Sequence, residues 1–262
     1  MKDTSNTLHI SLIQSPLHWE SPEANRAMFE EKISLVNKEV DIFILPEMFT
    51  TGFTMDAENN AEMMNLHTYK WLHQIAENTG AVVTGSVIIR ESNQYYNRLL
   101  WMPPDGKVQW YDKKHLFRMA DEHLFFSPGE SRLITRVKGW KICPLICYDL
   151  RFPEWARNRY DPKNEALDYD LLVYVANWPA AREEAWDTLL RARAIENLSY
   201  SAGVNRMGSD GNDIFYSGHT SVYDFKGQKL VYSENEEVIS ISLDMQKLRE
   251  FREKFPTYLD AK

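Results

Sequence analysis

The feature that most constrains the fold is an order of strands and helices that occurs twice along the chain. In the first half, apolar strands at 8–14 and 41–47 flank a helix at 22–39 whose apolar residues have helical spacing. A second helix at 61–80 is followed by three strands between residues 81 and 113, and the last two strands form a hairpin. Strand 41–47 is apolar on both faces, which is typical of a buried strand in a parallel sheet.

The second half of the chain repeats this order. Two strands lie within 133–147, a helix is expected at 152–160, and an apolar strand at 168–177 precedes an amphipathic helix at 182–199. Further strands and a charged helix complete the chain, at 200–206, 218–224, 228–233, 236–244 and 245–255. Sheets and helices with one apolar face bury that face against another layer. Residues 1–262 are therefore predicted to form a single α/β domain, a four-layer αββα sandwich of two packed mixed sheets with outer helices.

Short sequence signals mark several element boundaries. Ser21 is expected to cap the first helix, with Pro22 in its first turn, and Gly80 is expected to end the second helix. The run Pro104-Asp105-Gly106 has the composition of a turn between two strands of a hairpin.

The charge balance and the cysteine count restrict the partners and the compartment. A net charge of −8 argues against nucleic acid or an anionic membrane surface as the main partner. No apolar stretch approaches the roughly 20 residues of a membrane span, and the first residues lack the apolar core of a secretory signal. Cys143 and Cys147 are the only cysteines and form no disulfide framework, so the cytoplasm is the expected compartment.

Three predicted strands end abruptly in a polar or nucleophilic residue. These residues are Glu47, Cys147 and Asn177. Ligands of open α/β sheets bind beyond the carboxyl ends of strands, so three such ends in register would form one site. Segment 111–130 is long and irregular, and its aromatic content favours an ordered, functional loop.

Each of these residues taken alone has an ordinary structural explanation. Glu47 can cap a turn, a lone buried cysteine is usually inert, and Asp149 can pair with Arg151. Together they indicate nucleophilic catalysis, because a thiol becomes reactive when a base takes its proton or a cation stabilises the thiolate. Glu47 would be the base, Lys113 the cation and Cys147 the nucleophile at a turn with free backbone N–H groups.

At this point the sequence resembles the nitrilase superfamily, the carbon–nitrogen hydrolases. The resemblance rests on "LPEMFTTGF", "YDKKHLF" and "LICYDLRFPE", which occur in the family's order and extend to a likeness over nearly the whole chain. It implies an αββα sandwich and a catalytic triad of Glu47, Lys113 and Cys147, with no metal or cofactor. The family's K-x-H-L pattern selects Lys113 over Lys114, and Glu122 before the "SPG" turn matches the family's second, structural glutamate.

The wording of the motifs narrows the expected activity. "HLFRMADEH", "CYDLRFPEWARN" and "ANWPAAR" are similar to the bacterial omega-amidases, which hydrolyse the terminal amide of 2-oxoglutaramate or 2-oxosuccinamate. Nitrilases and N-carbamoyl amino acid hydrolases of the same superfamily are ranked lower. The resemblance also implies a homodimer or higher homo-oligomer, formed through the helices beside the cysteine and after "NWP".

A two-step acyl transfer through a thioester is the expected mechanism. Lys113 and the backbone N–H of Tyr148 would stabilise the oxyanion, and Glu122 would hold Lys113 or the substrate amide. Arg118 is the candidate anchor for a substrate carboxylate. Trp178 and Phe53 are candidates for the pocket walls, and Arg151 is assigned to support of the cysteine turn.

Two alternatives of other classes stay open on the sequence. A metal-dependent phosphoesterase could use oxygen-rich ligands from Glu47, Asn177, Asp210, Asp213 and His219, but this leaves Cys147 and Lys113 without roles. An inactive family member acting as a binding scaffold is the second alternative, and the retention of all three catalytic residue types argues against it.

Overall fold

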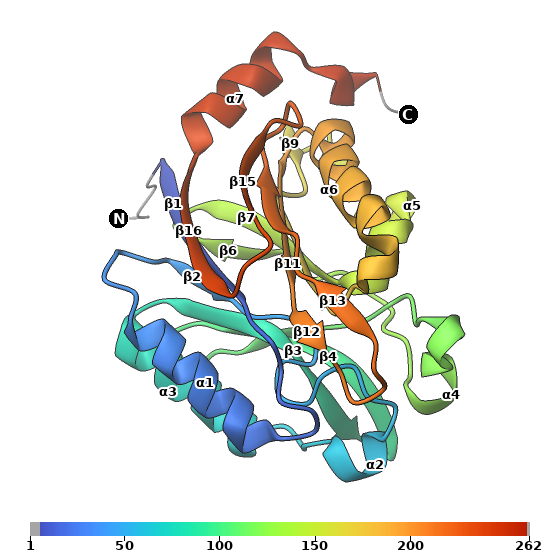
Figure 1. Ribbon diagram of the computed structural model, residues 1–262. Helices are drawn as coiled ribbons and strands as arrows, with labels where there is room; N and C mark the ends of the chain where they lie inside the picture. Colours follow the sequence, from blue (N-terminus) through green and yellow to red (C-terminus); the bar gives the residue numbers. More distant parts are fainter. Residues whose placement is uncertain (1–5, 261–262) are drawn as a thin grey trace.

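Two mixed six-stranded sheets pack face to face between outer helices (Figure 1). The computed structural model describes residues 6–260, so residues 1–5 and 261–262 of the predicted domain lie outside the described residues. The first sheet has the order β16 (Glu237–Asp244), β1 (Thr7–Gln14), β2 (Ile42–Ile44), β3 (Val82–Glu91), β4 (Gln94–Met102) and β5 (Gln109–Asp112). The second has the order β15 (Lys229–Ser233), β14 (Thr220–Tyr223), β11 (Tyr200–Asn205), β10 (Leu171–Ala176), β7 (Trp140–Ile146) and β6 (Thr135–Val137). The predicted αββα sandwich is confirmed.

The central strands of both sheets are parallel, as their apolar composition predicts. β1, β2 and β3 pair in parallel in the first sheet, and β7, β10 and β11 do so in the second. Side chains of β2 alternate between two cores: Ile42 and Ile44 pack between the sheets, while Phe43 faces the outer helices. Parallel pairing brings the carboxyl ends of these strands to one edge of the sandwich.

The outer layers are formed by helices that cover the two sheets. α1 (Pro22–Ser34) and α3 (His67–Thr79) contribute Phe29, Ile33, Leu72 and Ile75 to the core outside the first sheet. α6 (Glu183–Asn197) lies on the second sheet beside α5 (Pro153–Ala156), and α7 (Met245–Lys254) lies at the C-terminal end (Figure 1). The remaining elements are α2 (Ala57–Asn60), α4 (Glu122–Phe125), β8 (Tyr160–Asp161), β9 (Ala166–Leu167), β12 (Met207–Ser209), β13 (Phe215–Ser217) and the 3₁₀ turns η1 (Arg118–Ala120), η2 (Cys147–Arg151), η3 (Ala180–Arg182) and η4 (Thr257–Leu259).

The predicted helix at 61–80 begins six residues late. Glu62 is drawn to the sheet instead, since its N–H donates to the carbonyl of Ile88 and its own carbonyl accepts from Arg90. Its carboxylate then accepts the N–H of Thr68 at 2.8 Å, in the first turn of α3. The predicted end is correct, because Gly80 has a φ of +67° in the left-handed region.

Of three other predicted features, two helices need correction and one hairpin is confirmed. The helix predicted at 22–39 ends at Ser34, and the side chain of Ser21 makes no capping hydrogen bond although Pro22 does occupy the first turn. The helix predicted at 152–160 is a single turn, α5, because the chain turns to pair β8 with β9. The hairpin between β4 and β5 is confirmed. Among residues 6–260, no helix combines the length and the apolar composition needed to cross a membrane.

Gly203 on β11 permits the close approach of α6 to the second sheet. A Cβ at this position would lie 2.5 Å from Cδ1 of Leu190 and 2.7 Å from Cζ2 of Trp186.

We expect Gly203→Ala to lower the free energy of unfolding by about 1–3 kcal/mol, because the packed helix must shift to make room. Urea denaturation measures this change. Ser201→Ala on the same strand is the control, since this hydroxyl is buried without a hydrogen-bond partner in residues 6–260. Equal stability of the two variants would contradict the packing argument.

Candidate active site

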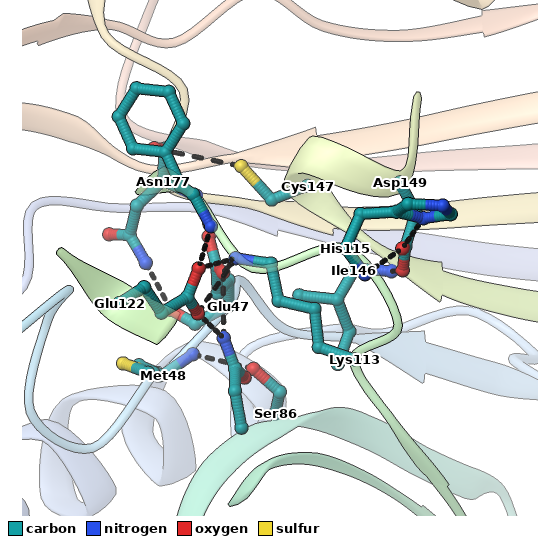
Figure 2. Close-up of polar contacts among 12 residues, drawn as sticks. Glu47, Met48, Ser86, Lys113, His115, Glu122, Ile146, Cys147, Asp149 and Asn177 are labelled. Carbon is teal, nitrogen blue, oxygen red and sulfur yellow. Dashed lines mark hydrogen bonds and ion pairs between the residues drawn. The ribbon is translucent and has the colours of Figure 1, made fainter. Parts of the chain in front are cut away.

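The polar strand ends predicted from the sequence meet between the two sheets. Glu47 follows β2 and Lys113 follows β5, both in the first sheet. Cys147 follows β7 and Asn177 follows β10 in the second. Figure 2 shows these four side chains turned toward one another, with Glu122 from α4 beside them. The site therefore forms where the carboxyl ends of strands from both sheets face each other.

Lys113 lies between two carboxylates in the interior. Its Nζ is 2.8 Å from Oε1 of Glu47 and 3.0 Å from both carboxylate oxygens of Glu122. The residue is 1% exposed. Burial opposes its charge, but the negative charges of Glu122 and Glu47 outweigh burial and raise the pKa of Lys113. Lys114 instead places its ammonium over the ring of Trp155, so the geometry distinguishes the two tandem lysines.

Glu122 is fully buried and bound on several sides. Besides Lys113, its carboxylate accepts the N–H of Phe117 at 2.6 Å and the side-chain amide of Asn97 at 3.3 Å. Burial and the neighbouring charge of Glu47 raise the pKa of Glu122, while Lys113 opposes the rise. Glu122 thus holds Lys113 and the loop after it in one place.

Glu47 connects the two sheets through Asn177. The backbone N–H of Asn177 donates to Oε2 of Glu47 at 2.8 Å, and its side-chain amide donates to the backbone carbonyl of Glu47 at 2.6 Å. Oε1 accepts from Lys113 and from Nδ2 of Asn97, each at 2.8 Å. A carboxylate has about four lone-pair sites, so these three contacts leave one on Oε2 for a further donor.

Cys147 stands in a strained backbone conformation at the end of β7. Its φ of +43° is in the left-handed region, which a non-glycine residue adopts at a cost of about 1–3 kcal/mol. The residue is 8% exposed, and its thiol lies 3.8 Å from the carbonyl oxygen of Asn177. Burial raises the pKa of Cys147 well above its usual value, and the charge of Glu47 adds to the rise while Lys113 opposes it. This environment therefore favours the neutral thiol over the thiolate.

Asp149 joins the turn after Cys147 to the loop around Lys113. Its carboxylate accepts the hydroxyl of Tyr111 at 2.7 Å, and both the N–H and the ring Nδ1 of His115 approach it within 3.0 Å. It also accepts the N–H of Ile146 at 3.1 Å. Asp149 therefore does not pair with Arg151, which was one reading of the sequence. It fixes the position of the turn after Cys147 relative to the loop around Lys113.

A cavity of about 450 Å³ opens onto Cys147 and Lys113. Of the four residues predicted to bind substrate, Phe53, Tyr148 and Trp178 line this cavity. Arg118 is exposed on η1 and is not part of the lining. Further apolar walls come from Met55, Phe117, Met119, Pro179, Ile214 and Tyr216.

Two guanidinium groups on the cavity wall have no acidic partner. Arg151 and Arg182 line the cavity, and the side chain of neither makes a hydrogen bond or ion pair with any residue in 6–260. Arg151 lies over the ring of Trp178, and Arg182 lies over the ring of Phe117. The one acid in the lining, Asp210, is occupied by two backbone N–H groups and the hydroxyl of Tyr216. The wall thus offers positive charge to an anion.

The residues of the metal-site alternative do not converge. Glu47 is bound by Lys113 and two amides, and Asp210 by donors of its own hairpin. His219 pairs with Asp187 at 3.0 Å. Among residues 6–260, no group of three or more His, Cys, Asp or Glu side chains is arranged to hold a metal ion. The geometry gives the phosphoesterase alternative no support.

The sequence reasoning missed several residues that shape this site. Asn97, a polar side chain close to the apolar run that ends β4, was a detectable signal, because a buried amide requires partners. The bridging role of Asp149 and the position of Arg182 depend on the paths of irregular loops, and the sequence holds no signal for either.

Comparisons with known proteins cover nearly the whole chain. The sequence model of the carbon–nitrogen hydrolase family matches residues 9–253. Omega-amidase YafV of Escherichia coli strain K12 is 44% identical over 256 residues, which are 97% of this chain and 96% of the relative. A 2-oxoglutaramate amidase of Bacillus subtilis strain 168 is 34% identical over 257 residues, with 97% of each chain covered.

Two solved structures share this fold over nearly the whole chain. A CN-hydrolase superfamily protein from Xanthomonas campestris, with an arsenic adduct in its active site, has a TM-score of 0.96 at 46% identity, with 98% of each chain covered. Saccharomyces cerevisiae Nit3, from branch 10 of the nitrilase superfamily, has a TM-score of 0.84 at 25% identity, with 98% of this chain and 97% of Nit3 covered.

The charge environment of Cys147 predicts how its thiol reacts with an alkylating reagent. Because the negative charge of Glu47 raises the pKa of Cys147, Glu47→Gln should lower it and increase the thiolate fraction. We expect alkylation by iodoacetamide at about pH 7 to be about tenfold faster, which corresponds to about one pKa unit. Mass spectrometry of the modified residue gives the rate. Lys113→Met should have the opposite effect, and a slower reaction of Glu47→Gln would contradict this account.

Proposed function

The chain belongs to the carbon–nitrogen hydrolase family, and from that premise we propose that it releases ammonia from the omega-amide of a short 2-oxo acid, such as 2-oxoglutaramate or 2-oxosuccinamate. It is a hydrolase of carbon–nitrogen bonds in linear amides. One observation carries the finer proposal: Cys147 and Lys113, which pairs with Glu47, line the same cavity as two guanidinium groups that make no hydrogen bond or ion pair within residues 6–260. The relatives named for omega-amides support the same substrate class.

In the proposed first step, Cys147 attacks the amide carbon while Glu47 takes the thiol proton. The remaining lone pair on Oε2 of Glu47 is the acceptor, so proton transfer accompanies formation of the carbon–sulfur bond. Lys113 and the backbone N–H of Tyr148 stabilise the oxyanion, and each such donor typically contributes about 3–4 kcal/mol. Glu47 then returns the proton to the leaving nitrogen as the carbon–nitrogen bond breaks, and ammonia departs.

In the proposed second step, water hydrolyses the thioester. Glu47 takes a proton from the attacking water, the carbon–sulfur bond breaks with release of the dicarboxylic acid, and Glu47 returns the proton to the sulfur to regenerate the thiol. Glu122 keeps Lys113 oriented during both steps through its two contacts of 3.0 Å. No step needs a metal or an organic cofactor.

Arg151 and Arg182 are the proposed anchors for the substrate carboxylate. A guanidinium binds a carboxylate with two parallel hydrogen bonds, and neither group makes a hydrogen bond or ion pair with a residue of 6–260. Their positive charge also disfavours the α-ammonium group of glutamine relative to the uncharged 2-oxo group. Arg118, the anchor expected from the sequence, lies outside the cavity lining, and Arg151, expected only to support the cysteine turn, lies in it.

We extend the proposal to the assembly and the compartment. Residues 1–262 act as one catalytic domain, since the site draws side chains from both sheets. A homodimer or higher homo-oligomer forms through α5 and α6, and Ile195 on α6 exposes apolar surface there. Both cysteines are free thiols, which suits the reducing cytoplasm.

An ammonia-release assay tests the proposed reaction. Wild-type protein should hydrolyse 2-oxoglutaramate or 2-oxosuccinamate in preference to glutamine, asparagine, simple nitriles and N-carbamoyl amino acids. Cys147→Ala should lower kcat at least about ten-thousand-fold, because the nucleophile is lost. Cys143→Ala is the matched control and should stay within a few-fold of wild type, since this thiol is buried in the core with its pKa raised to about 12. Comparable losses of kcat in both variants would show that the assignment of Cys147 as the nucleophile is wrong.

The anchoring proposal predicts a loss of discrimination between charged and neutral amides. Arg182→Gln should lower kcat/KM for 2-oxoglutaramate by about tenfold to a hundredfold, mainly through KM, because a hydrogen bond to a charged group contributes about 1.5–3 kcal/mol. Its kcat/KM for a neutral amide such as propanamide should change little. Arg118→Gln removes an equal charge outside the cavity and should leave both values unchanged. A greater effect of Arg118→Gln would restore the anchor expected from the sequence.

A further inference from the structure

A second cavity, of about 340 Å³, lies at the opposite end of β7 from Cys147. It is bounded by β6 and the start of β7, by the β8–β9 hairpin, and by α7 with the turn that follows it. Its lining contains four cationic side chains, namely Arg136, Lys141, Arg249 and Arg252, and two acids. This cavity is positively charged although the whole chain carries a net charge of −8.

Two of these cations face each other across neighbouring strands. Arg136 on β6 and Lys141 on β7 are direct partners in the antiparallel register. Like charges in that position repel and destabilise the strand pair. Neither side chain forms an ion pair within residues 6–260, and the ammonium of Lys141 donates only to the backbone carbonyl of Leu167. The fold therefore retains a repulsion that a bound anion would relieve.

The pKa of Lys141 reflects this repulsion. Burial lowers the pKa of its half-buried ammonium, and the charges of Arg252 and Arg136 lower it further against the opposing effect of Asp170. An anion beside Lys141 would raise its pKa again and so offset both burial and the neighbouring cations.

The other two cations are on one face of α7, three residues apart. Arg252 is fully engaged, since it binds Asp170 at 2.6 Å and the carbonyls of Leu198 and Tyr169 at 2.8 Å. Asp170 is thereby paired with Arg252. The guanidinium of Arg249 is exposed and has no hydrogen bond or ion pair within residues 6–260. Arg136, Lys141 and Arg249 thus remain as donors toward the cavity.

We propose that this cavity binds a small organic molecule through a doubly charged anionic head group, held by Arg136, Lys141 and Arg249. A guanidinium binds phosphate and carboxylate oxygens in pairs, and an ammonium adds a compact charge. The head group is either a phosphate or a pair of neighbouring carboxylates. Tyr160 and Tyr258, whose ring centroids are 5.1 Å apart, form an aromatic wall for the body of the ligand. This site is separate from the proposed catalytic cavity and does not depend on the reaction proposed for it.

Calorimetric titration of the full chain at low ionic strength tests the proposal, with adenosine monophosphate, citrate and inorganic phosphate as probes. At least one of the two organic probes should bind saturably and raise Tm. Tighter binding of adenosine monophosphate identifies phosphate as the head group, and tighter binding of citrate identifies carboxylates. Arg136→Ala/Arg249→Ala should weaken this binding at least tenfold, and its ammonia release without a probe should match wild type.

Two control variants separate this site from general charge effects and from the catalytic cavity. Arg90→Ala/Arg191→Ala removes two exposed arginines elsewhere and should leave binding unchanged. Arg182→Gln should also leave it unchanged. Absence of binding by both organic probes, equal binding by Arg136→Ala/Arg249→Ala, or loss of binding in Arg182→Gln would each overturn the proposal.

Discussion

The buried ammonium of Lys113 between the carboxylates of Glu47 and Glu122 is the interaction on which the candidate active site depends. A charge in the interior is tolerated only when it is paired and hydrogen-bonded, and removing one partner of such a cluster typically costs about 3–5 kcal/mol. Here two carboxylates surround one ammonium, so the cluster carries an excess of negative charge. Burial and the negative charge of Glu47 raise the pKa of Cys147, while Lys113 opposes the rise, so this environment favours the neutral thiol.

The charge distribution of the cavity is asymmetric because of this cluster. Its floor, around Lys113, holds the excess negative charge, whereas its wall carries the guanidinium groups of Arg151 and Arg182. A substrate with a neutral amide at one end and a carboxylate at the other fits this arrangement in a single orientation. In the proposed reaction, the same electrostatic asymmetry that binds the acid end therefore brings the amide to the thiol.

Much of the fold followed from the sequence, because alternating and uninterrupted apolar runs determine which strands are buried and how they pair. The polar ends of β2, β7 and β10 also predicted that Glu47, Cys147 and Asn177 would share one edge. Other features could not be predicted in this way. Helix α3 starts late because Glu62 bonds to a strand distant in sequence. Arg182 reaches the cavity, and Arg118 does not, because of the paths of two irregular loops.

The long sequence separations within the site have a consequence for how the chain matures. Glu47 reaches Lys113 across 66 positions and Asn177 across 130, while Asp149 ties in the lysine loop from 34 positions away. The contacts of Glu47 with Asn177 and of Asp149 with the lysine loop join the two sheets, so they form only once the sheets have docked. A nascent or partly folded chain therefore displays an ordinary thiol. Its hydrolytic chemistry arises only at the last stage of assembly, when Glu47, Lys113 and Cys147 are brought together.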